Sequence, residues 1–117
     1  MSTGSVVPFT PNQPTQNALP SVTANSLFSI NSCDSVLIYN GNASAVILVA
    51  FATETNLYTA TPLITTGVPV GPGQSILLGI SGVGGFASDP IVQVAFVGIG
   101  TVGAGNAYIS PGLGTQH

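Results

Sequence analysis

From residue 25 onward, apolar and polar residues alternate over short stretches that are separated by glycine, proline and asparagine. Alternation with a period of two is typical of β-strands whose two faces differ in burial. No window shows the apolar spacing of three to four residues, with capping residues, that predicts an amphipathic helix. We therefore predict strands over residues 27–30, 35–39, 44–53, 74–80, 91–98 and 106–110.

A turn former separates two of these apolar stretches. Asn40-Gly41-Asn42 contains an Asn-Gly pair, which favours the type I′ turn of a β-hairpin. We therefore expect a hairpin that joins residues 35–39 to residues 44–53. The second stretch includes the apolar run 45–52, whose length predicts a strand buried on both faces.

The other segments are less regular. Residues 57–65 alternate poorly and contain Pro62, which predicts an edge strand or an irregular crossing. We expect residues 67–73 to be a loop with a short extended piece, residues 82–89 to be a glycine loop, and residues 111–114 to end the fold. About seven short strands at turn spacings of about eight to twelve residues predict an all-β domain over residues 25–117, a single β-sandwich or jelly-roll-like domain or a small barrel.

Residues 1–24 differ from this domain. Pro8, Pro11, Pro14 and Pro20 lie among Ser, Thr, Asn and Gln, and each proline fixes its own φ and removes a hydrogen-bond donor. We expect an extended N-terminal arm without strands. A solvated tail has no need of apolar residues, so we interpret the arm as docking on a neighbouring subunit; the alternative is a loosely held terminus. Its candidate contact residues are Val6, Val7, Pro8, Phe9 and Leu19.

The charge of the chain excludes several classes of function. The 117 residues include no Lys or Arg and three acidic residues, Asp34, Glu54 and Asp89, so the net charge is −3. Without cations the chain cannot neutralise phosphates by counterion release, which excludes ordinary nucleic-acid binding. It also has no lysine for a P-loop or Schiff base. So few charges in a folded protein indicate that a partner covers much of its surface.

Candidate chemistry is sparse. The single His117 lies at the end of the chain, where a catalytic base would not be held rigidly, so we expect no enzyme. The His, the Cys and the acidic residues lack metal-ligand spacing, and we expect no metal or cofactor, although a calcium site built from backbone carbonyls stays open. The glycine loops precede strands instead of helices, so they do not match a phosphate-binding loop. We expect the lone Cys33 to be a small buried residue, and the match of Asn42-Ala43-Ser44 to the N-glycosylation pattern to be chance.

The aromatic residues divide by their context. Phe28, Phe51 and Phe96 fall on predicted strands and are candidates for the core. Phe86 lies in the glycine loop and is a further candidate for partner contact. Tyr39 or Tyr58 could stack on a sugar ring if either is exposed beside Asn and Gln side chains.

Targeting signals are not evident in this sequence. Met1 begins a polar stretch without the basic and apolar regions of a signal peptide, and the longest apolar run is far shorter than the roughly 20 residues of a membrane helix. We therefore expect synthesis in the cytoplasm and no membrane anchor.

Four stretches together resemble a pattern in small proteins of tailed bacteriophages: residues 44–51 (SAVILVAF), 70–75 (VGPGQS), 92–96 (VQVAF) and 107–114 (AYISPGLG). The pattern is similar to that of the small jelly-roll cement or decoration proteins that dock on the outside of icosahedral heads. The resemblance implies a virion protein on the capsid exterior that stabilises capsomer joints. Its implied partners are the major capsid protein and further copies of itself, as a dimer or trimer.

Other functions fit the same composition. The chain could be a tail, fibre or head-fibre component that contacts the host, or a carbohydrate-binding β-sandwich acting as a monomer. It could also polymerise by itself, because strands such as AVILVAF combine high β-propensity with low charge.

Overall fold

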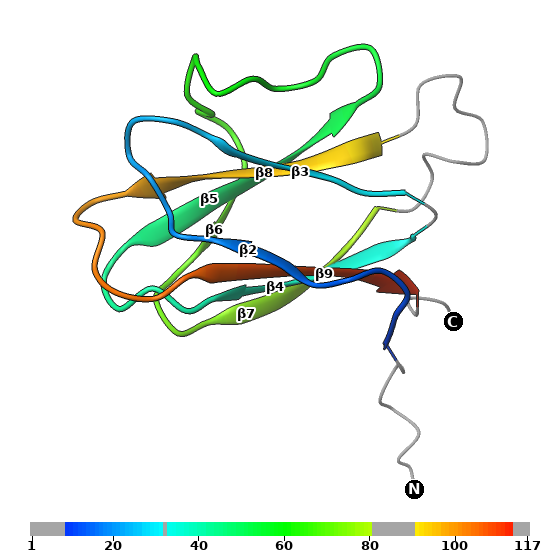
Figure 1. Ribbon diagram of the computed structural model, residues 1–117, viewed down its shortest axis with the longest axis horizontal. Helices are drawn as coiled ribbons and strands as arrows, with labels where there is room; N and C mark the ends of the chain where they lie inside the picture. The colour runs from blue at the N-terminus through cyan, green and yellow to red at the C-terminus, as the bar shows by residue number, and fades with distance from the viewer. Residues whose placement is uncertain (1–8, 32, 81–90, 114–117) are drawn as a thin grey trace, which may run out of the picture.

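The computed structural model describes residues 9–31, 33–80 and 91–113, and all regular structure within them is β. Nine strands form two antiparallel sheets that pack face to face as a β-sandwich (Figure 1). The predicted fold class is therefore confirmed. The strands are β1 (Thr10–Pro11), β2 (Gln16–Ala18), β3 (Ser26–Ser29), β4 (Ser35–Asn40), β5 (Val46–Thr53), β6 (Val68–Val70), β7 (Ser75–Gly79), β8 (Ile91–Ile99) and β9 (Ala107–Leu113).

The strand order is that of a rolled hairpin. One sheet has the order β2-β9-β4-β7, with β1 also paired to β9, and the other has the order β3-β8-β5-β6. The pairs β2·β9, β3·β8, β4·β7 and β5·β6 are those of one long hairpin whose tip lies between β5 and β6. The further pairs β4·β9 and β5·β8 arise because this hairpin is rolled into two layers. Most consecutive strands therefore lie in opposite sheets.

The prediction of a hairpin at Asn40-Gly41-Asn42 is wrong. β4 and β5 belong to different sheets, so these residues cross from one layer to the other. Local turn propensity was overridden by the tertiary pairing of β4 with β7 and β9. The Asn40 and Asn42 side chains are fully buried and bond to backbone groups, which explains the two asparagines better than a two-residue turn does.

The expectation of an N-terminal arm without strands is also wrong for its described part. Residues 10–11 and 16–18 pair with β9 of the same chain and form the edge of its sheet. Prolines suit this position, because an edge strand has one side whose N–H groups need no partner. Pairing across about 90 positions of sequence leaves no local periodicity that would reveal it.

The last strand is longer than expected. β9 continues through Pro111 to Leu113 although we expected residues 111–114 to end the fold. The β4–β9 ladder loses no bond at Pro111, because alternate residues of an antiparallel strand face opposite neighbours and Pro111 faces β1. There its carbonyl accepts the Asn12 N–H at 3.2 Å.

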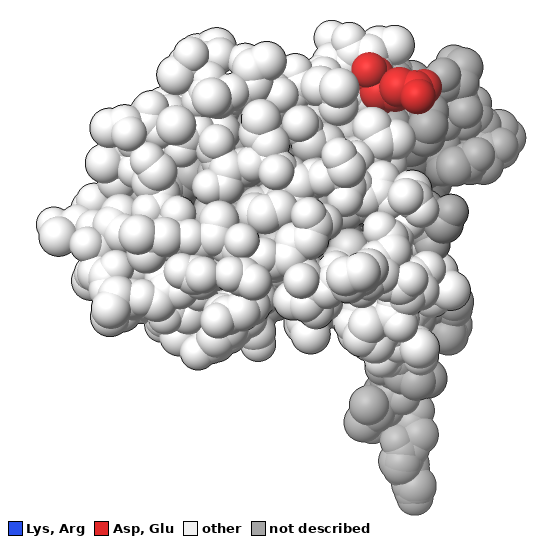
Figure 2. Space-filling model, viewed as in Figure 1, with Lys and Arg blue, Asp and Glu red and all other residues white. Residues whose placement is uncertain are grey.

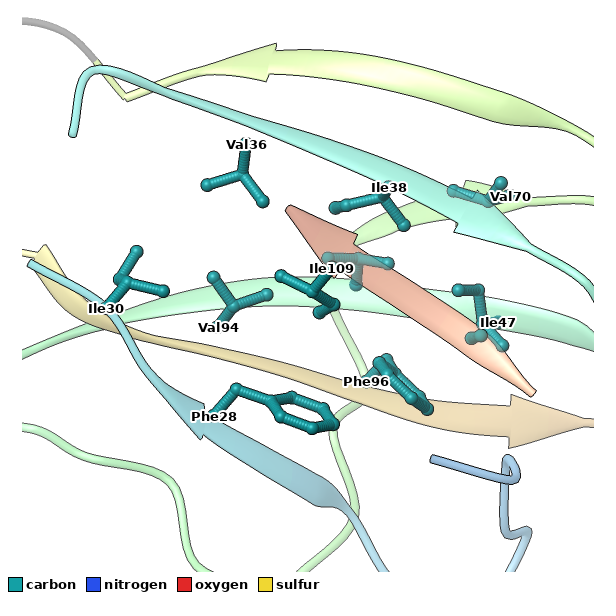
Figure 3. Packing of buried hydrophobic residues seen from close by; sticks show 11 residues of the cluster. Phe28, Ile30, Val36, Ile38, Ile47, Val70, Val94, Phe96 and Ile109 are labelled. Atoms are coloured by element: carbon teal, nitrogen blue, oxygen red, sulfur yellow. The ribbon is translucent and has the colours of Figure 1, made fainter. Parts of the chain in front are cut away.

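The hydrophobic core lies between the two sheets, where side chains from β3, β4, β5, β8 and β9 point toward one another (Figure 3). The rings of Phe28 and Phe96 stack with centroids 5.4 Å apart, which confirms both as core residues. Phe51 is half-buried and packs against the same cluster. The fully buried members from facing strands include Val36, Ile38, Ile47, Val94 and Ile109.

Candidate interaction surface

The outer face of the β2-β9-β4-β7 sheet carries large exposed side chains, and we call it the bare face. β4 points Val36 and Ile38 into the core, so Leu37 and Tyr39 point outward. Leu37 lies opposite Leu77 of β7, and Tyr39 lies opposite Tyr108 of β9. These four side chains are 36–44% exposed, and together they form an apolar surface across β7, β4 and β9.

The two tyrosines form a pair. Their ring centroids are 6.1 Å apart and their planes differ by 27°. Gly41 lies close to both rings, because a Cβ at this position would stand 3.0 Å from an atom of the Tyr39 ring and 3.6 Å from one of the Tyr108 ring. Asn17 lies opposite Tyr108, and its side-chain oxygen accepts a bond of 2.7 Å from the Asn106 amide. The pair is therefore bordered by amides.

Formal charge is nearly absent from the described surface. Asp34 and Glu54 are the acidic residues among the described ranges, and Asp34 lies just before β4. In Figure 2 the described residues show one small acidic area and are otherwise white. A partner that covers the bare face would not have to strip water from a charged group at its centre, which removes the largest desolvation cost of association.

The outer face of the other sheet is covered by its own chain. Residues 54–67, between β5 and β6, arch over the β3-β8-β5-β6 sheet (Figure 1). Beneath this segment lies a second hydrophobic cluster, so β5 is buried on both faces, as predicted, although by an irregular segment. The segment is the irregular crossing that Pro62 indicated. The cluster contains Ala50, Ile64, Ala95 and Val97, with Leu48 and Tyr58 against them.

Buried amides hold this covering segment in place. The Asn25 side chain donates to the carbonyls of Thr59 and Pro62 at 2.8 and 2.9 Å and accepts the Ile64 N–H at 3.0 Å. The Gln93 side chain accepts the Tyr58 N–H at 2.8 Å. The segment also forms an open pocket of about 340 Å³ that is lined by Leu57, Tyr58, Thr59, Pro62, Leu63, Ile64, Thr65 and Thr66.

A second set of amides joins the loops at one end of the sandwich. The Asn40 amide donates to the carbonyls of Ala45 and Val70, and the Asn42 amide donates to those of Gly103 and Gly105. The Asn42 side-chain oxygen also accepts backbone N–H groups at 3.0–3.2 Å. An amide with all of these bonds is not available to a glycosyl donor in the folded protein. This agrees with the interpretation of the glycosylation pattern as chance.

The lone cysteine is half-buried, not fully buried. Cys33 packs against the edge of the core. Burial raises the pKa of its thiol above the usual value, and the neighbouring Asp34 carboxylate raises it further. A thiol that holds its proton more firmly is a weaker nucleophile at neutral pH. Among the described residues, no three His, Cys, Asp or Glu side chains lie close enough together to hold a metal ion.

The predicted contact residues are only partly placed. Val6, Val7, Pro8 and Phe86 lie outside the described residues. Phe9 is half-buried, with its ring against Gly112 of its own β9, whereas Leu19 is 54% exposed after β2. The sequence reasoning missed the Leu37–Leu77 and Tyr39–Tyr108 pairs, because residues 36–39 are all apolar and do not reveal which face is buried.

Comparison of the chain with protein-family models, with curated proteins and with solved structures finds no significant match. No helix within the described ranges is long and apolar enough to cross a membrane.

Proposed function

We propose that this chain is a structural virion protein, a cement or decoration subunit that binds the outside of an icosahedral bacteriophage head and stabilises the joints between capsomers. The observation that carries the proposal is the bare face, which offers Leu37, Tyr39, Leu77 and Tyr108 without a charged group among them. Interface cores are depleted of charge and enriched in tyrosine. Weak contacts of this kind become strong when many copies bind one lattice.

The strand order supports the proposal by analogy. We propose that the orders β2-β9-β4-β7, with β1 added beside β9, and β3-β8-β5-β6 form a jelly roll, an architecture that is frequent in viral capsid and lectin domains. Fold alone does not assign a function, so this argument is an analogy. It favours the two classes, shell protein and sugar binder, that the bare face also suits.

The first experiment is quantitative mass spectrometry of purified virus particles whose genome encodes the chain. Hundreds of copies per particle are expected for a shell protein. A handful of copies would assign the chain to the tail or a fibre, and none would contradict the proposal.

A matched pair of variants then tests the face itself. Tyr108→Asp places a charge at the centre of the bare face and is expected to reduce incorporation at least tenfold. Leu57→Asp alters a similarly exposed residue on the covering segment of the opposite sheet and should leave incorporation unchanged. Circular dichroism of both purified proteins verifies folding, and equal incorporation of the two variants would reject the bare face as the docking surface.

The arm provides a second test. We propose that residues 1–8, which include Val6 and Val7, add a contact with a neighbouring subunit. The deletion must stop at residue 8, because residues 10–18 form β1 and β2 of the chain's own sheet. Truncation of residues 1–8 is expected to weaken particle binding while the melting temperature stays within a few degrees. Undiminished binding would refute the arm contact.

Carbohydrate binding is the second candidate, and the tyrosine pair favours it. Tyr39 is exposed beside Tyr108, and the Asn17 and Asn106 amides border the two rings. Stacked aromatic rings with amides at their margin suit the apolar face and hydroxyl groups of a sugar. A glycan array with the purified chain tests this directly. Binding that Tyr39→Ala abolishes would support the sugar site, and an array without signal would remove it.

A further inference from the structure

Among the residues that the structure describes, none pairs with the outer edge of β7, the last strand of the bare sheet, so we call this edge open. β7 pairs with β4 on one side and ends the order β2-β9-β4-β7. Its five residues, Ser-Ile-Leu-Leu-Gly, contain no proline and no charge. Exposed edges of this kind normally attract another strand, and proteins usually block them.

The other edges of the sandwich are blocked by the devices that natural proteins use. β6 has three residues with Pro69 in the middle. β1 and β2 are shorter than β7, and Pro11 and Pro14 lie in or between them. On β3, the outward Ser29 carbonyl accepts a bond of 3.1 Å from the Gln16 side chain. The contrast indicates that the β7 edge is kept open for a partner strand.

The backbone fixes which groups β7 offers. The Asn40 N–H donates to the Gln74 carbonyl, and the Ile80 N–H donates to the Asp34 carbonyl. Because antiparallel residues alternate between inward and outward bonding, the even-numbered residues bond to β4. The backbone N–H and C=O groups of Ser75, Leu77 and Gly79 therefore face the open edge.

The core side chains are also less deeply buried at this edge. Val36 and Ile38 of β4 are fully buried, whereas Ile76 and Leu78 of β7, which point into the same core, are only half-buried. A strand added beside β7 would cover these two side chains. Apolar burial and backbone bonding therefore favour the same addition.

We propose that the partner strand is β7 of a second copy, so that two chains form a dimer across a two-fold axis at Leu77. Ser75, Leu77 and Gly79, whose backbone groups face the open edge, are self-complementary when two copies pair about this axis. Leu77 faces Leu77 of the second copy, and Ser75 faces its Gly79, with each pair exchanging both N–H···O bonds. The Leu37–Leu77 row then continues across both copies, and no charge opposes another at the seam.

Neither copy has a Lys or Arg, so the contact depends on backbone bonds and apolar packing and not on salt bridges. The two-fold pairing uses the open β7 edge of each copy. No open β7 edge is left for a third copy, so the assembly stops at two. The dimer concerns the β7 edge and does not require the virion function, so it is tested on purified protein without particles.

The experiment combines sedimentation equilibrium with site-specific crosslinking of the full chain. The unaltered protein is expected to sediment at twice the monomer mass. Leu77→Asp places two carboxylates opposite each other and is expected to weaken the dimer at least tenfold. Tyr108→Asp, on the same face but two strands away, should remain dimeric, which separates this test from that of particle binding.

Crosslinking tests the proposed register of the two β7 strands, and it does so even if the Leu77→Asp variant fails to fold. In a Cys33→Ala background, Leu77→Cys should form a disulfide-linked dimer in air, because paired Cα atoms lie about 5.5 Å apart, inside the roughly 4.4–6.8 Å that a disulfide spans. Ser75→Cys and Gly79→Cys should not crosslink alone but should crosslink when mixed. A monomer, a filament, or efficient crosslinking of Ser75→Cys alone would overturn the proposal.

Discussion

The two outer faces of the sandwich carry similar apolar side chains but have different surroundings. On β8, Val97 is 3% exposed because residues 54–67 fold over it, whereas Leu37 on β4 is 36% exposed. The covering segment is the tip of the rolled hairpin, and it is anchored by Asn25 and Gln93. The bare sheet has no such segment among the described residues. An apolar outer position requires a cover, and we propose that on the bare face another molecule provides it.

The largest expected effect comes from placing a carboxylate at matched positions on the covered face and on the bare face. Val97→Asp places a carboxylate under the covering segment, where the chain has no Lys or Arg to pair with it. We expect the free energy of unfolding to fall by about 3–5 kcal/mol. Leu37→Asp remains hydrated on the bare face and should cost less than about 1 kcal/mol. Urea denaturation measures both, and equal losses would show that the two faces do not differ in cover.

The next effect concerns the anchor of the covering segment. Asn25→Ala removes two donated bonds and one accepted bond and leaves the backbone groups of Thr59, Pro62 and Ile64 without this partner. A loss of about 2–3 kcal/mol in stability is expected. Asn56→Ala, at an exposed asparagine of the same segment, is the control and should change stability by less than about 0.5 kcal/mol. Similar values for the two variants would mean that Asn25 is not the anchor.

A smaller effect measures how much the bare face contributes on its own. A double-mutant cycle with Tyr39→Ala and Tyr108→Ala should give a coupling of about 0.5 kcal/mol, the low end for aromatic pairs, because both rings are partly hydrated. The corresponding cycle for the buried Phe28 and Phe96 should give a larger value. If the tyrosine coupling is the larger one, the bare face contributes to the fold of the monomer and is not reserved for a partner.

The smallest effect concerns Cys33, which precedes β4, packs against the edge of the core and neighbours Asp34. Because the folded-state pKa of the thiol is raised above its unfolded value, its contribution to stability is fully present below the unfolded pKa, which is near 9.0, and is lost as the pH rises through the folded pKa. The decline in stability above pH 9 should therefore diminish in Cys33→Ala. Alkylation at neutral pH should be slower than for a free cysteine and faster in Asp34→Asn. Unchanged rates in that variant would exclude the carboxylate as a cause of the raised pKa.

Strand positions could be predicted because their signals are local. The predicted stretches 35–39, 74–80 and 91–98 match β4, β7 and β8 to within one residue at each end. Asn40-Gly41 misled because its turn propensity is also local, whereas the partners of β4 are 36 (Tyr39 to Ser75) to 77 (Ser35 to Gly112) residues away in the sequence. β1 and β2 were missed for the same reason, since their strand character exists only in their pairing with β9.

The amino-acid sequence alone establishes which interactions this protein lacks and which elements it must form. Without Lys or Arg, no internal salt bridge with those residues and no phosphate-neutralising cationic patch can form, and trypsin has no site to cut. Alternation with a period of two required strands, and the apolar residues required two layers with a core between them. These properties follow from the identity of side chains and from local backbone preference, so no knowledge of long-range contacts was needed.

Which apolar residues are buried and which are exposed depends on the tertiary fold. The rolled hairpin places its tip over one sheet and leaves Leu37, Tyr39, Leu77 and Tyr108 open on the other. Register decided this outcome, because a shift of one residue would exchange the two faces of β4 and bury Leu37 and Tyr39 instead of Val36 and Ile38. The register depends on pairings between residues far apart in the chain, and neither composition nor local periodicity contains them.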